Sequence, residues 1–120
     1  MHPILQQAYD TELKAAVTRY RAGDFDQAFS HLERAHILGQ SFNIAHARSH
    51  WWMLKVGWKR RDLVEVIGQV SRIVGALLFS RIWVPVGNTG GAHVSPFKSM
   101  PIPEDLQNIL GTYGRGPTAE

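Results

Sequence analysis

The feature that most constrains the fold is an internal repeat with an offset of 38 residues. The string "YRAGDFDQAFSHLERA" at 20–35 aligns with "WKRRDLVEVIGQVSRI" at 58–73. Asp24 then falls on Asp62, and apolar residues fall on apolar residues at helical spacing. Each copy has the pattern of a helix, a turn carrying Asp, and a second helix. A fixed period of this length is typical of stacked supersecondary units, so the repeat predicts two helical hairpins.

The bounds of the four helices follow from apolar stripes with 3–4 spacing and from turn residues. Asp24 and Asp62 are predicted N-caps, because a side-chain oxygen there accepts from an otherwise free backbone N–H. Gly23 and Gly39 end the preceding helices. The predicted helices span residues 4–21, 25–38, 43–59 and 62–79.

The segment "AGDFDQAFSHLERA" resembles the tetratricopeptide repeat, which has apolar residues of matching size at the positions of Ala28, Leu32 and Ala35. The second copy departs from that pattern, since Arg61 stands where the turn glycine is expected. The predicted fold class is all-α, with two stacked tetratricopeptide-like hairpins; a plain four-helix bundle is the alternative.

The C-terminal third has a different character. Residues 80–102 are rich in proline and glycine, which disfavour helix, yet they keep many apolar side chains. We therefore expect an extended tail that packs across the helices, with "GNTGGAH" as a tight turn. A short helix is predicted at 103–110, a single domain over 1–110, and a flexible tail at 111–120. The tryptophans are expected in the core or in the seams between helices: Trp51, Trp52, Trp58 and Trp83. Trp51 and Trp52 face different sides of one helix, so one of them is expected under the tail or on an exposed patch.

Composition excludes several classes of protein. With 44% hydrophobic and 19% charged residues, the 120-residue chain has a globular balance. It has no cysteine, which excludes disulfides and thiolate metal sites. A net charge of +3 is too small to predict a nucleic-acid partner. No uncharged apolar run is long enough to span a membrane and no signal-peptide pattern is present, so we expect a cytoplasmic protein.

Three long strings carry a further resemblance: "HLERAHILGQ", "HARSHWWML" and "GNTGGAHVSPFKSMPIPEDL". Through them the whole chain resembles a family of small bacterial proteins classed as a domain of unknown function. The resemblance implies a self-contained helical protein and no known activity.

Four of the six histidines lie between residues 31 and 52, at His31, His36, His46 and His50. In an antiparallel hairpin about a turn at 39–42, residues whose numbers sum to about 81 lie side by side, which pairs His31 with His50 and His36 with His46. His46 and His50 are four apart and share one helix face, a spacing by which a helix offers two nitrogens to one metal ion.

The angle between His31 and His36 limits this cluster. Five residues on a helix of 3.6 residues per turn place them about 140° apart, so both cannot face the third helix. The predicted metal ligands are therefore His36, His46 and His50, with His31 and His93 as further candidates. Glu12 and Glu33 are candidate extra ligands or partners of the ligands. Three imidazoles suit zinc, copper, nickel or ferrous iron. A hydrogen-bonded structural cluster and unrelated surface histidines remain the alternatives.

These features favour a non-enzymatic helical-repeat binding or scaffold module, linked to a metal through the histidine cluster. Repeat hairpins present surfaces to peptides or partner proteins. Two repeats are fewer than a free-standing array needs, so either the tail or a second copy of the chain is expected to complete the surface. The alternative function is a small metal-dependent enzyme that uses His36, His46 and His50.

Overall fold

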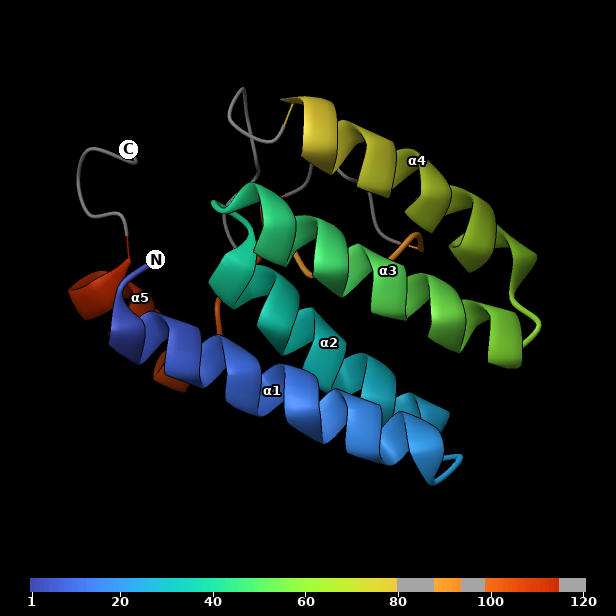
Figure 1. Cartoon of the computed structure of the whole chain (residues 1–120), viewed down its shortest axis with the longest axis horizontal. Helices are drawn as coiled ribbons and strands as arrows, with labels where there is room; N and C mark the ends of the chain where they lie inside the picture. Colours follow the sequence, from blue (N-terminus) through green and yellow to red (C-terminus); the bar gives the residue numbers. More distant parts are fainter. Residues whose placement is uncertain (80–87, 94–98, 115–120) are drawn as a thin grey trace.

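The residues that the structure describes form five helices, α1 (Pro3–Arg21), α2 (Phe25–Gly39), α3 (Asn43–Lys59), α4 (Leu63–Phe79) and α5 (Glu104–Tyr113), shown in Figure 1. The coordinates are a computed structural model that describes residues 1–79, 88–93 and 99–114. No strand occurs within these ranges, so the all-α prediction is confirmed. The first four helices begin and end within one residue of their predicted bounds, and α5 continues three residues beyond its predicted end.

The two copies of the repeat share one turn geometry. Gly23 has φ +80° and Arg61 has φ +55°, both in the left-handed region. The backbone N–H of Gly23 donates to Tyr20 O at 3.1 Å, and that of Arg61 donates to Trp58 O at the same distance. The 38-residue offset therefore holds for the backbone as well as for the sequence.

The two aspartates cap the helices that follow these turns. Asp24 Oδ1 accepts from the backbone N–H of Gln27 at 3.2 Å, and Asp62 Oδ1 accepts from that of Glu65 at 3.0 Å. Each bond satisfies an N–H that has no partner within the helix. Both predicted N-caps are confirmed.

The helices pack in sequence order, α1 on α2, α2 on α3 and α3 on α4, and α5 contacts α1 and α2. Two apolar clusters fill the seams. One is formed by Leu5, Tyr9, Ala35, Ile37, Leu38 and Leu106. The other is formed by Ala16, Ala28, Leu32, Met53 and Val56.

The tryptophans do not form the core. Trp58 is exposed, so the core or seam prediction is wrong for this residue. Trp51 is exposed and Trp52 is half-buried, which agrees with the expectation that one of these two lies on an exposed patch. Lys55 lies over the rings of both Trp51 and Trp52, with Nζ 4.2 Å from the centroid of Trp52, which gives these rings a cationic neighbour at the surface. Trp83 lies outside the described residues.

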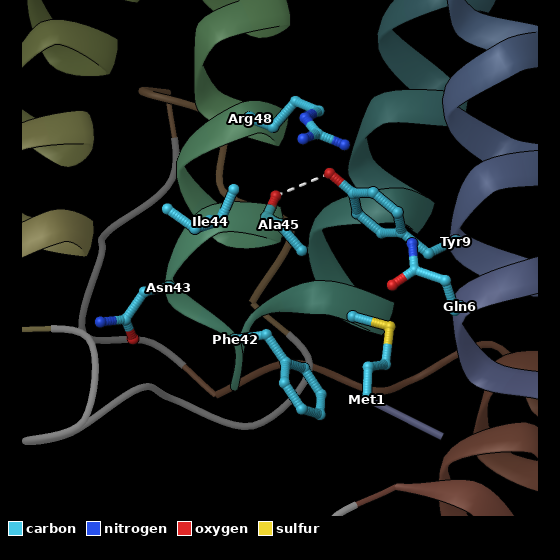
Figure 2. Close-up of a pocket in the computed structure, with 8 residues that line it drawn as sticks. All are labelled: Met1, Gln6, Tyr9, Phe42, Asn43, Ile44, Ala45 and Arg48. Atoms are coloured by element: carbon cyan, nitrogen blue, oxygen red, sulfur yellow. Dashed lines mark hydrogen bonds between the residues drawn. The ribbon is translucent and has the colours of Figure 1, made fainter. Parts of the chain in front are cut away.

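Tyr9 links α1 to the start of α3 and lines a pocket there (Figure 2). Its hydroxyl donates to Ala45 O at 2.7 Å. Its ring covers Gly39, where an added Cβ would lie 2.8 Å from Tyr9 Cε2. The glycine that ends α2 therefore also permits the close approach of α1. The pocket is lined by residues that include Met1, Gln6, Phe42, Ile44 and Arg48.

The part of the tail that the structure describes packs against the helices. Asn88, Gly90 and Gly91 are buried. Gly90 has φ +87°, and a Cβ there would lie 2.5 Å from His36 Cδ2. Only glycine fits this backbone angle and this contact. The rest of the predicted tail, at 80–87 and 94–98, and most of the predicted flexible end, at 115–120, fall outside the described residues.

Within the described ranges, no helix combines the length and apolar character needed to cross a bilayer.

The matched turns generate a stability prediction. Arg61→Gly should raise the free energy of unfolding by about 0.5–1 kcal/mol, because relief of left-handed strain outweighs the added entropy of the unfolded chain. Gly23→Ala should lower it by about 1 kcal/mol from backbone strain alone, since a Cβ at Gly23 meets no atom within 4 Å. Urea unfolding measures both variants. Equal effects of the same sign would contradict the shared geometry.

Candidate functional site: a buried three-histidine cluster

His36 on α2 meets His46 and His50 on α3 in the interior of the protein. His36 Nε2 lies 2.9 Å from His46 Nε2, which lies 3.0 Å from His50 Nε2. The three ring centroids are 4.7 Å from one another. All three side chains are buried. The structure thus brings together the three histidines that the hairpin register and the four-residue spacing predict.

The protonation of two rings is fixed by their outer nitrogens. His36 Nδ1 lies 2.8 Å from the backbone oxygen of Asn88, and His50 Nδ1 lies 2.5 Å from Gln69 Oε1. The orientation of the Gln69 amide is set in turn, since its nitrogen donates to Glu65 Oε2 and to Gly90 O. Both acceptors are oxygens, so both Nδ1 atoms carry the hydrogen. The Nε2 atoms of His36 and His50 therefore present lone pairs.

His46 cannot satisfy both of these lone pairs. A neutral imidazole has one N–H, so His46 Nε2 donates to one neighbour at most. Its own Nδ1 is buried without a hydrogen-bond partner among the described residues. At least one inward lone pair thus lacks a donor in the metal-free protein. A bound cation would accept all three lone pairs at once.

Burial keeps the cluster neutral. It lowers the pKa of His46 to about 4. Burial and then the neighbouring His46 lower the pKa of His50 to about 3. The pKa of His36 is held well below its usual range by burial and then by His50 and His46. Since only the neutral ring can ligate a metal, all three are ready to bind at neutral pH.

The remaining candidate ligands lie elsewhere. His31 Nδ1 lies 2.8 Å from Glu12 Oε1, and Arg34 Nε donates to the other oxygen of that carboxylate at 2.9 Å. His93 is exposed and its Nε2 lies 2.6 Å from Asp62 Oδ2. Burial raises the pKa of Glu33, which is not a member of the cluster. The extra ligands proposed from the sequence therefore do not join the three histidines.

Sequence reasoning missed the residues that surround the cluster. Glu65 and Gln69 are buried polar residues, four apart, on the largely apolar α4. That pair was the available signal, because polar residues inside an apolar helix need internal partners. Asn88 and Gly90 contribute through their backbone oxygens. Any residue type has such an oxygen, so the sequence could signal only the glycine.

Fold and site together define a class of protein, a small all-helical protein of two hairpins that enclose a buried histidine cluster. The chain belongs to the family described as protein of unknown function (DUF3703), whose model matches residues 4–110. This confirms the resemblance drawn from the three sequence strings. No curated protein matches the chain, and no solved structure does. The tetratricopeptide likeness therefore stays a prediction.

The lowered pKa values predict acid sensitivity of the metal-free protein. The unfolded chain takes up protons near pH 6.5, whereas folded His46 and His50 take them up only near pH 4 and pH 3. The free energy of unfolding is therefore highest above pH 6.5, where these histidines are neutral in the folded and the unfolded chain, and it falls as the pH drops toward 4. The loss from pH 7 to pH 5 should be about 2 kcal/mol for each histidine kept neutral by the fold.

Urea unfolding in the presence of a chelator measures this loss. His50→Gln should flatten the pH dependence, whereas His2→Asn, at an exposed helix N-cap, should leave it unchanged. A stability that does not vary between pH 7 and pH 5 would contradict a neutral cluster.

Proposed function

We propose that this protein is a helical module that binds one divalent transition-metal ion through Nε2 of His36, His46 and His50. The observation that carries the proposal is the convergence of these three atoms, with two of them held as lone-pair donors by hydrogen bonds on the far side of the ring.

The spacing of the nitrogens supports this proposal. Tetrahedral zinc with Zn–N bonds of 2.0–2.1 Å needs nitrogens about 3.3 Å apart. The Nε2 atom of His46 lies 2.9 Å from that of His36 and 3.0 Å from that of His50, and small ring rotations bring both distances to that value. An all-imidazole ligand set suits zinc, copper, nickel or iron and disfavours magnesium and calcium, which prefer oxygen ligands.

Residues around the ligands supply orientation and charge. The Glu65 carboxylate accepts a hydrogen bond from the Gln69 amide, and the Gln69 oxygen accepts one from His50. The carboxylate therefore polarises the His50 ring through the amide. Glu65 Oε2 also accepts from the backbone N–H of Ala92 at 2.7 Å. Partners of this kind fix ring orientation and increase ligand basicity. The buried carboxylate would offset part of the charge of the cation.

Burial of the cluster favours binding over catalysis. Turnover needs a metal position that substrate can reach, and the three rings are almost fully enclosed. We propose that the metal belongs to a binding or scaffold module that binds a protein or peptide partner in the cytoplasm of a bacterium.

A small metal-dependent enzyme is the second candidate, because three protein ligands are the number that catalytic zinc sites use. Within the described residues, the ligand group at this place contains only the three histidines, which leaves a fourth position for water or substrate.

Metal analysis of untagged protein tests the first proposal. After dialysis against zinc we expect one ion per chain, and zinc at a hundred times its Kd should raise the free energy of unfolding by about 2.7 kcal/mol. His46→Ala or His50→Ala should abolish both effects. The control is His31→Ala, which removes a histidine outside the cluster. Wild-type protein that binds no metal, or equal loss in all three variants, would overturn the proposal.

Cobalt(II) separates the two candidates, because its visible spectrum reports coordination. A closed binding site predicts a spectrum that added azide does not change. A shift on addition of azide would show an exchangeable fourth ligand and favour the enzyme.

A further inference from the structure

The outer face of α4 carries a row of exposed apolar side chains. This row, the α4 stripe, consists of Leu63, Ile67, Val70 and Val74, with exposed fractions of 66%, 67%, 49% and 52%. At about 100° per residue the four side chains lie within an arc of about 60°. Their 4-3-4 spacing is that of the seam between two packed helices. A row of this kind on a globular domain marks an interaction surface.

The position of α4 leaves this face without a helix partner among the described elements. α4 packs on α3 and lies at the opposite edge of the helix layer from α1 (Figure 1). The charged side chains of the helix point elsewhere: Glu65 is buried, and Arg72 is half-buried beside Gly90 O. Over its described length the stripe contains no charged residue. A partner for it must therefore present an uncharged apolar ridge.

We propose that the α4 stripe is the interface between two copies of this chain, with the two α4 helices packed antiparallel about a twofold axis. The stripe is complementary to itself in this arrangement. Residues whose numbers sum to 137 lie opposite one another, which pairs Leu63 with Val74 of the second copy and Ile67 with its Val70. A twofold contact uses one surface twice, so a single stripe suffices.

Charge at the two ends of α4 selects the antiparallel direction. Lys59, Arg60 and Arg61 precede α4 and lie near its N-terminus, which carries the positive end of the helix dipole. The last turn of α4 contains no basic residue. Antiparallel packing moves the basic cluster of each copy toward the negative end of the other helix. A parallel pair would place the two basic clusters together.

This proposal is independent of the metal site, because the stripe residues are exposed on α4 whereas the three histidines are buried on α2 and α3. Its consequence is a continuous stack of four hairpins with the edge of each α4 covered. Such a stack exceeds the number of repeats that a free-standing array needs.

Cysteine cross-linking tests the register, since the chain has no native cysteine. In the antiparallel pair, residue 63 is offset by about 16 Å from residue 63 of the other copy, too far for a disulfide, which needs Cα atoms within about 7 Å. Leu63→Cys alone and Val74→Cys alone should therefore give no covalent dimer. An equimolar mixture of the two should give the mixed dimer in high yield. Disulfide formation in each variant alone would indicate parallel packing and overturn the proposal.

Sedimentation velocity provides a second measurement. Wild-type protein should sediment as a dimer and Val70→Glu as a monomer with unchanged helical content. The control is Ile4→Glu, an exposed apolar position on α1, which should remain a dimer. A wild-type monomer at all concentrations would refute the interface. A monomer that binds anionic lipid vesicles through the same residues would assign the stripe to a membrane surface and equally refute it.

Discussion

The hydrogen bonds of the Gln69 side-chain amide hold α3, α4 and the tail segment around Gly90 together. Its oxygen accepts from His50 on α3, and its nitrogen donates to Glu65 on α4 and to the backbone of Gly90. Three segments are thus joined through one buried group. Because every member is removed from water, loss of any partner would leave a buried polar atom unsatisfied, at a cost of about 1–3 kcal/mol. Such a network fixes one arrangement of its segments.

The two hairpins share one turn geometry but bury different kinds of side chain. Between α1 and α2 the fully buried side chains are apolar, among them Ala16, Ala28 and Leu32. Between α3 and α4 the buried side chains include Glu65 and Gln69, which occupy the repeat positions of Gln27 and His31. Gly57 makes room for the second arrangement, since a Cβ there would lie 3.0 Å from Glu65 Cγ. The buried polar residues of the second hairpin hold His50, and the histidine cluster itself lies between the two hairpins, on α2 and α3.

Much of the candidate site could be predicted from local spacing. The register of a hairpin follows from its turn, and the face of a helix follows from 3.6 residues per turn, so His36, His46 and His50 could be grouped before any coordinates. The same geometry indicates that His31 and His36 cannot both face α3, although the sequence keeps His31 as a further candidate ligand. The exposure of Trp58 could not be predicted this way, because local spacing does not show which large ring another segment will cover.

The sequence by itself determined the helices, their order and their turns, because capping, helical periodicity and a 38-residue repeat are local properties of the chain. It also determined which histidines can meet. Only the tertiary structure decided which ring nitrogens of those histidines carry the hydrogen. The tautomers of His36 and His50 depend on oxygens of Asn88 and Gln69, which lie 52 and 19 residues away along the chain. Contacts at such separations are set by how the helices and the tail close around one another, and no local pattern encodes them.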